Sequence, residues 1–448
     1  MNSRPLLLAK IMTKQELLQT ARETLEANWR APGFSVPSGR LYPFQWNWDS
    51  GFTSIGNAHI NPQRALREME TLFTGQWANG MVPHIIFHSE KETTYFPNFD
   101  FWDTTVNAGA PQRPKTSGIT QPAVHGFVLE HLLNTFPDDA ATIATVKALF
   151  PRVVNSHRFL YIYRDPEREG LMFMYHPWET GRDNSPLWDA SMDRIVIDKG
   201  TLPAYTRQDT KIAAADERPT ADQYDRYVHQ LELGKRNGYD GPGIFAESEI
   251  LIQDTLMNAL LIKSNASLIR IGQRFGFDVG ELEEWQQQST RAFQQKLWHE
   301  ELQTFVPYDV RAGAQIAERE IGSFTALSAG IASDKQAKIL NDYLQSLHDR
   351  GFYLCPSFDP DSPHFDSRRY WRGPIWPHMN WLIHDGLKNY GFGKMAEVVR
   401  NDAIHLIREF GFYEYFDCQK NTAPDLTQGY GGDQFSWTAA CLIDLIET

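Results

Sequence analysis

The sequence is poor in cysteine and lacks long runs of apolar residues. Its three cysteines, Cys355, Cys418 and Cys441, lie far apart without the short spacings of metal sites, so neither a disulfide framework nor a zinc site is expected. One short apolar patch at residues 6–9 is not followed by the cleavage pattern of a secretion signal. No run is long enough to span a bilayer. We therefore expect a cytoplasmic protein without a membrane-spanning segment.

An excess of basic residues is also missing. The formal net charge is −13 and no basic run occurs, which disfavours nucleic acids and anionic membranes as partners. A small anionic ligand remains compatible with this charge, because a local arginine cluster can outweigh distant acidic residues. The HExxH, GxGxxG and GxxxxGK[ST] patterns are absent, so we predict neither a metal nor a nucleotide cofactor.

Apolar residues do recur with the spacing of amphipathic helices. Thr13 followed by Glu16 forms a capping box ahead of an apolar stripe, and Ser333 with Gln336 repeats this arrangement. Strand-like alternation is sparse, so the sequence predicts an all-α chain. Further helices are expected over residues 62–76, 123–136, 140–163, 249–275, 279–298, 376–390 and 393–410.

The connections between these helices alternate between short and long. Long loops without secondary structure of their own are usually functional or disordered, and these are too aromatic for disorder. Short turns at one end and long loops at the other predict an (α/α) barrel whose long loops share one face. We expect one domain over residues 1–448, with residues 201–242 as a lid. The long loops cover residues 31–52, 88–122, 165–189, 201–242, 355–376 and 411–435.

Two of these loops carry carboxylates in aromatic surroundings: Asp183 in PWETGRDNSP and Glu414 in GFYEYFD. Hydrolysis of a glycosidic bond usually requires two carboxyl groups on opposite sides of one sugar ring. The acid of such a pair needs a pKa above the usual value of about 3.9, through burial or a neighbouring like charge. Glu179 is an alternative acid and Asp417 an alternative base, and each of these residues could also be an ordinary loop carboxylate.

Aromatic residues make up 13% of the chain, more than packing requires, and they gather in the same loops. Tyr42, Phe44, Trp46 and Trp48 fall at every second position ahead of Asp49 and would point one way in an extended loop. Flat apolar rings suit the C–H faces of a pyranose, and Asp49 could accept hydrogen bonds from sugar hydroxyls. The alternative is that these rings only close the end of the barrel.

Six segments in this order resemble glycoside hydrolase family 63 and its trehalase relatives, most closely the bacterial mannosylglycerate and glucosylglycerate hydrolases. The resemblance spans nearly the whole chain. It implies an (α/α)6 barrel that hydrolyses α-glycosides with inversion and without a cofactor. The segments are LYPFQWNWDSGF (41–52), TQP (120–122), PWETGRDNSP (177–186), YWRGPIWPHMNW (370–381), FYEYFD (412–417) and GDQFSWTA (432–439).

The resemblance also implies roles for individual residues. Asp183 matches the general acid and Glu414 the general base. Gln434 matches another ligand contact, with Gln428 as the alternative because the segment ahead of it is longer than in the family. Positions matching the sugar subsite are Tyr42, Trp48, Asp49, His84, Gln121 and Trp178, and those matching the glycerate subsite are Tyr370, Trp371, Arg218 and Tyr224 or Tyr227. We add Trp46 from the aromatic run and Arg182 beside Asp183 to the predicted substrate contacts.

The sequence thus predicts an inverting glycosidase that acts on glucosylglycerate, mannosylglycerate or both, with a small-molecule sugar as its partner. A trehalase-like or oligosaccharide α-glucosidase would need no arginine beside the leaving group. An (α/α)6 epimerase would rely on a histidine pair, and a non-hydrolytic sugar-binding protein would tolerate loss of both carboxylates. The choice between glucose and mannose stays open, and the sequence is compatible with a homo-oligomer.

Overall fold

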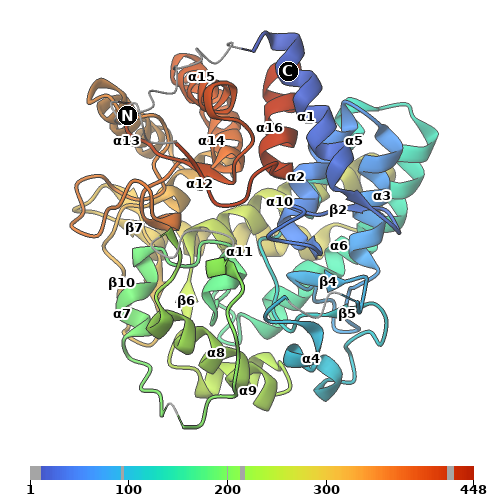
Figure 1. The fold of residues 1–448 in the computed structure, drawn as a ribbon, viewed down its shortest axis with the longest axis vertical. Coiled ribbons are helices and arrows are strands. Elements are labelled where there is room, and N and C mark those ends of the chain that lie inside the picture. The colour runs from blue at the N-terminus through green and yellow to red at the C-terminus, as the bar shows by residue number, and fades with distance from the viewer. Residues whose placement is uncertain (1–11, 92–94, 199, 212–216, 421–427) are drawn as a thin grey trace, which may run out of the picture.

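The computed structural model describes residues 12–91, 95–198, 200–211, 217–420 and 428–448, and its architecture is helical (Figure 1). The α-helices are α1 (Lys14–Asn28), α2 (Asn47–Ala58), α3 (Pro62–Phe73), α4 (Phe99–Trp102), α5 (His125–Thr135), α6 (Ala140–Tyr163), α7 (Asp189–Met192), α8 (Ala221–Arg236), α9 (Gly241–Glu247), α10 (Thr255–Phe275), α11 (Gly280–Leu297), α12 (Thr325–Ser328), α13 (Asp334–Asp349), α14 (Pro377–Asn389), α15 (Gly393–Phe410) and α16 (Ser436–Glu447).

Local sequence signals explain where many of these helices begin. The capping boxes predicted at Thr13 and Ser333 are confirmed at the starts of α1 and α13. A third one, Thr220 with Gln223, begins α8 inside the predicted lid. Helix α6 has the predicted bounds, with its N-cap Asp139 accepting a hydrogen bond from the backbone of Thr142.

Six helices form a closed inner ring in which each packs against the next: α2, α5, α10, α12, α14 and α16, which returns to α2. A second layer lies outside this ring. Helix α1 packs on α16, α3 on α2, α6 on α5, α11 on α10, α15 on α14, and α13 on α15. Figure 1 shows α1 in blue beside α16 in red, so the first and last helices of the described chain pack together where the ring closes. This double ring confirms the predicted (α/α)6 barrel.

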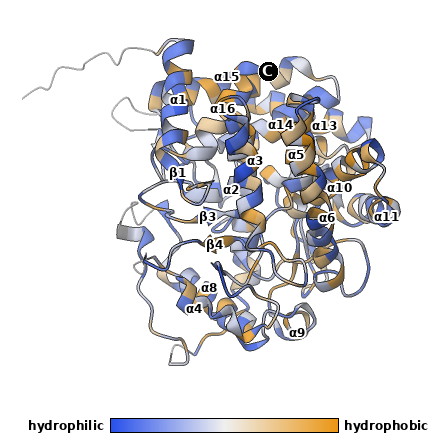
Figure 2. Ribbon diagram, turned by 90° about the vertical axis from the view of Figure 1, so that its right-hand side faces the viewer, coloured by the Kyte–Doolittle hydropathy of each residue, from blue (hydrophilic) through white to orange (hydrophobic). Residues whose placement is uncertain are grey.

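Burial follows the two layers. All 12 residues of α2 are buried, whereas the 18-residue α11 buries only Leu282, Ser289, Phe293 and Leu297. In Figure 2 hydrophilic and hydrophobic turns alternate along α1 and α11, as expected for helices with one buried face. Helices α2 and α16 were not among the predicted helices, because a helix buried on all sides has no periodic apolar stripe.

The strands are two or three residues long and tie the loops together. They are β1 (Trp29–Arg30), β2 (Phe34–Ser35), β3 (Gln45–Trp46), β4 (Ile85–Phe87), β5 (Lys115–Thr116), β6 (Ile252–Gln253), β7 (Trp298–His299), β8 (Thr304–Phe305), β9 (Tyr308–Asp309), β10 (Ala314–Gln315), β11 (Tyr415–Phe416) and β12 (Gly429–Tyr430). All the pairs are antiparallel; β4 lies between β3 and β5, while β11 pairs with β12 directly after Glu414.

One large hydrophobic cluster extends along the chain from Phe44 to Leu445 and joins both layers. A smaller cluster packs α1 against α15 and α16. These cores agree with a single domain, which stays a prediction. Among the described residues, no helix is both long and apolar enough to cross a membrane.

Candidate active site

A pocket of about 520 Å³ opens at the end of the barrel where inner helices α2 and α16 begin. Its size is typical of small-molecule sites. Trp48 and Asp49 come from the first turn of α2, and Phe435 and Trp437 from the start of α16. Most of the other lining residues come from the predicted long loops, whereas Tyr224 belongs to α8 and His84 precedes β4. Those predicted from sequence are Tyr42, Trp46, Trp48, Asp49, His84, Gln121, Trp178, Asp183, Arg218, Tyr224, Tyr370 and Glu414.

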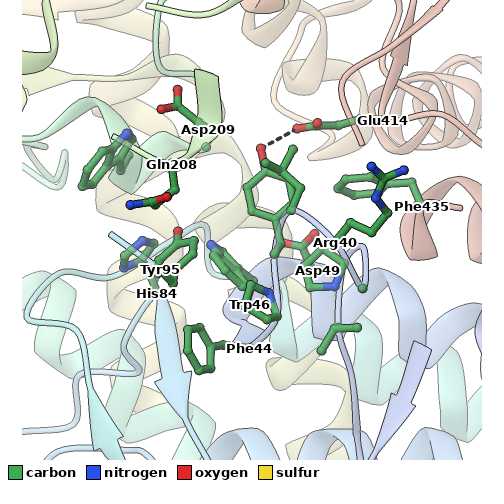
Figure 3. Close-up of a pocket in the computed structure, with 18 of the residues that line it drawn as sticks. Arg40, Phe44, Trp46, Asp49, His84, Tyr95, Gln208, Asp209, Glu414 and Phe435 are labelled. Carbon is green, nitrogen blue, oxygen red and sulfur yellow. Dashed lines mark hydrogen bonds between the residues drawn. The ribbon is translucent and has the colours of Figure 1, made fainter. Parts of the chain in front are cut away.

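Three hydrogen bonds hold the carboxylate of Glu414 in the pocket. The hydroxyls of Tyr42 and Tyr370 donate to its Oε1 at 3.0 and 3.3 Å, and the backbone N–H of Gly432 donates to Oε2 at 2.9 Å. Figure 3 shows its carboxylate pointing into the pocket. Burial raises the pKa of Glu414, while Arg218 and these donors act in the opposite direction. Gly431 presses against it, since a Cβ there would lie 2.3 Å from Oε2.

Asp183 meets the requirement for a proton donor. It follows the short 3₁₀ turn Pro177–Thr180, which ends at Gly181 with φ +67°, and a Cβ on that glycine would lie 2.4 Å from the ring of Trp48. The pKa of Asp183 is raised to about 7, mainly by burial. The negative charge of Glu414 contributes to this rise, and the positive charge of Arg218 opposes it. At neutral pH a large fraction of this carboxyl group is therefore protonated.

Asp49 is a third acid in the pocket. Burial, reinforced by the negative charge of Glu414, raises its pKa well above the usual range, so the neutral group can donate as well as accept hydrogen bonds. The expected extended run through Trp48 to Asp49 is wrong beyond Trp46, because α2 begins at Asn47. Trp48 and Asp49 nevertheless both reach the pocket from the first helical turn.

Arg218 brings positive charge to the same cavity. Its Nη1 and Nη2 lie 3.4 Å from the hydroxyl of Tyr42, and its guanidinium lies 4.4 Å from the centre of the Tyr370 ring. Its Nε bonds Asp209 at 3.3 Å. Asp209 is shared with Arg207 at 2.7 Å, so one carboxylate serves two guanidiniums.

Three carboxylates close to Arg218 in sequence, Asp216, Glu217 and Asp222, were possible partners for its guanidinium. Asp222 bonds Arg226 on α8, the Tyr415 hydroxyl donates to Glu217 at 3.5 Å, and Asp216 lies outside the described residues. Arg218 instead forms its ion pair with Asp209, near the start of the predicted lid.

The remaining predicted sugar contacts surround the pocket with rings and amides. His84 stacks on Trp178 with ring centres 6.4 Å apart, and burial lowers its pKa well below the usual range, so it is neutral. Gln121 Oε1 accepts a hydrogen bond from the Trp48 backbone at 3.3 Å, which leaves its amide nitrogen for other partners. Tyr224 contacts Trp178 edge to face.

Four predicted contacts do not line the pocket. Arg182 is fully buried in ion pairs with Asp254 and Glu320, and Gln434 is exposed with its carbonyl accepting from Asn28. Tyr227 and Trp371 lie behind the pocket wall: the Tyr227 hydroxyl accepts from the backbone of Asn184, and Trp371 stacks on Trp376.

The alternatives left open by the sequence also lie elsewhere. Glu179 is paired with Arg164 at 2.7 Å with both side chains buried, and Asp417 lies 3.4 Å from Arg368. Gln428, the alternative to Gln434, is buried between strands, where its carbonyl accepts from the backbone of Asp417. None of these three residues lines the pocket.

The pocket also contains residues that the sequence analysis missed. Figure 3 shows Gln208 and Asp209 from the predicted lid, Tyr95 from the loop before α4, and Phe435, which directly precedes α16. Trp437 lines the pocket from the first turn of α16. The FSW triplet at 435–437 was part of a quoted segment and could have identified the last two. Asp209 stands in no recognisable motif.

A barrel of paired helices with buried carboxylates, aromatic rings and an arginine around one pocket defines the class of glycoside hydrolases with the (α/α)6 fold. A family model described as a mannosylglycerate hydrolase MGH1-like glycoside hydrolase domain matches residues 42–438. The chain belongs to this family, within glycoside hydrolase family 63.

Individual relatives agree with this assignment. The crystal structure of a mannosylglycerate hydrolase from Thermus thermophilus, in complex with Tris and D-glycerate, has a TM-score of 0.89 and 38% identity over 96% of this chain and 99% of that one. A glucosylglycerate hydrolase from Mycolicibacterium hassiacum is 32% identical over 90% of this chain and 92% of its own length. The neutral trehalase of Saccharomyces cerevisiae, with a TM-score of 0.58 over 92% of this chain and 73% of that one, shares the fold at 17% identity.

Proposed function

We propose that this glycoside hydrolase cleaves an α-glycosyl glycerate, with mannose or glucose as the sugar, and inverts the anomeric centre. Asp183 protonates the glycosidic oxygen and Glu414 deprotonates the attacking water. The observation that carries the proposal is the placement of both buried carboxylates and Arg218 around one pocket. The relatives named above, one of them with D-glycerate bound, support this choice of substrate.

The environments of the two carboxylates suit these different roles. Glu414 accepts hydrogen bonds from two tyrosine hydroxyls and one backbone N–H, and these bonds stabilise its ionised form. Asp183 has a pKa of about 7 through burial, which keeps a proton available for the leaving group. Burial raises the pKa of both groups, but the three donors to Glu414 favour its ionised form, which supports assigning Glu414 as the base and Asp183 as the acid.

Arg218 is the proposed partner of the glycerate carboxylate. The guanidinium shares Asp209 with Arg207, so the local charge of these three groups is positive although the whole chain carries −13. A planar guanidinium can bond both oxygens of a carboxylate. Residues 201–242 supply Asp209, Arg218 and Tyr224, and their closure over the substrate as a lid is part of the proposal.

The reaction's stereochemistry tests the assignment of the base. Proton NMR in the first minutes of turnover of mannosylglycerate or glucosylglycerate should detect the β-anomer of the free hexose first. Early α-anomer would mean a covalent intermediate and would refute the role given to Glu414. Parallel incubation with trehalose tests the neutral-sugar alternative: faster release of hexose from trehalose than from either glycerate would overturn the substrate proposed here.

A further inference from the structure

A second cluster of chemically reactive side chains lies at the opposite end of the inner ring. Helix α2 enters the pocket with Trp48 and Asp49 in its first turn, and His59 follows its last residue, roughly 15 Å from Asp49 along the axis at 1.5 Å per residue. There His59 meets His131 from α5 and Asp444 from α16, 385 residues away from His59 in the sequence. This separation explains why no sequence motif indicated the cluster.

The three side chains have the geometry of an incomplete metal site. Their ligand atoms all lie within 4.8 Å of one another. Asp444 Oδ1 is 3.4 Å from His131 Nε2 and 2.7 Å from His59 Nε2. Ligands of a tetrahedral Zn²⁺ at 2.0–2.2 Å would be separated by roughly 3.3–3.6 Å, so the distance between Asp444 and His131 already fits and that between Asp444 and His59 must open by less than about 1 Å. The two imidazole nitrogens lie within 4.8 Å of each other and reach the same separation by a side-chain adjustment on the order of 1 Å.

The surroundings of the cluster favour a cation. The indole Nε1–H of Trp381 donates to Asp444 Oδ2 at 2.6 Å, which fixes the carboxylate with Oδ1 towards both imidazoles. His131 Nε2 is a buried nitrogen without a hydrogen-bond partner among the described residues. The side chains of His59 and His131 are 16% and 20% exposed, so water can supply the remaining coordination position.

We infer that His59, His131 and Asp444 bind one divalent transition cation of the Zn²⁺ type. Two imidazoles and one carboxylate are ligands that such cations prefer, and three protein ligands leave a position for water. The pocket lies at the other end of α2, so the cation lies away from the two carboxylates of the proposed reaction. It links α2 and α5, early in the chain, to α16 at its end, and thereby clamps the ring where it closes.

Zinc binding to chelator-treated protein, measured by titration calorimetry and by melting temperature, tests this inference. The wild type should bind one Zn²⁺ per chain and melt at a higher temperature with Zn²⁺ than with chelator. His131→Gln removes one ligand but keeps the His59–Asp444 ion pair, so the fold should persist while zinc affinity falls by about 100-fold or more. Trp381→Phe, which frees Asp444 Oδ2, should weaken binding by about 10- to 100-fold.

His405→Gln is the matched control, because His405 is an exposed histidine that stacks on Tyr353 and belongs to no group of possible metal ligands among the described residues. It should leave zinc binding unchanged. The visible spectrum of the Co²⁺-loaded wild type should show the strong absorption of a tetrahedral site, and this absorption should be missing in His131→Gln. Equal zinc affinity in wild type and His131→Gln, or no stoichiometric binding by the wild type, would overturn the inference.

Discussion

Arg182 and Arg218 are both buried arginines beside carboxylates, but the protein neutralises them to different degrees. Arg182 lies between two carboxylates, Asp254 and Glu320, and none of the three side chains is exposed. Arg218 shares the single carboxylate of Asp209 with Arg207 and borders the pocket. A fully compensated guanidinium can only support the fold, whereas an undercompensated one that faces a cavity can still attract an anion. Burial alone therefore does not identify a functional charge.

The largest expected effect is the loss of turnover when either carboxylate beside Arg218, Asp183 or Glu414, is replaced. Asp183→Asn removes the transferable proton and Glu414→Gln removes the base, so either should reduce kcat by about 10²–10⁴-fold. Both keep nearly the original shape, so melting temperature and substrate binding should change little. Steady-state kinetics with a glycosyl glycerate measure this. Glu179→Gln tests the alternative acid, and its rate is taken per folded protein because the change breaks the buried pair with Arg164. If the folded Glu179 variant lacks turnover while Asp183→Asn stays active, the acid is misassigned.

The second prediction concerns the loss of Arg182, the arginine that two carboxylates neutralise. Arg182→Gln leaves Asp254 and Glu320 buried without a counter-charge, and removing one partner of a buried ion pair typically costs about 3–5 kcal/mol of stability. Chemical denaturation should register this loss. Any loss of activity in the folded Arg182 variant, relative to the wild type, should be the same for a glycosyl glycerate and for the uncharged glycosyl glycerol. A selective rise of KM for the charged substrate at unchanged stability would place Arg182 at the substrate after all.

This contrast also shows what could and could not be read from the sequence. Outer helices such as α6 and α13 follow from caps and apolar stripes, because they keep one solvent-facing side. Arg182 and Asp183 are neighbours in one loop, and no local pattern tells which of them turns towards the pocket. Asp209 lies next to Arg218 because the loop between them folds back, and no sequence motif indicates this contact. Motif resemblance found residues that line the pocket, whereas long-range charge pairing required the three-dimensional structure.

The third prediction concerns the undercompensated arginine. Arg218→Gln should raise KM for a glycosyl glycerate by about tenfold to a hundredfold, because a charge-assisted hydrogen bond contributes about 1.5–3 kcal/mol. The uncharged glycosyl glycerol should be bound almost as before. Initial rates on both substrates, measured beside the Arg182 variant, separate the two arginines. Equal losses on both substrates would remove Arg218 from the glycerate subsite and favour a neutral substrate.

The smallest effect is a pH shift that also distinguishes the two arginines. A pKa of about 7 for Asp183 predicts that kcat/KM falls above neutrality, by up to about tenfold per pH unit as the acid loses its proton. The positive charge of Arg218 lowers this pKa, so Arg218→Gln should move the descending limb to higher pH. The uncharged glycosyl glycerol suits the measurement, since its binding does not depend on Arg218. Arg182→Gln should leave the limb in place, because Arg182 is not among the main charges that shift the pKa of Asp183. A shift in the Arg182 variant with none in the Arg218 variant would reverse the assignment of the two charges.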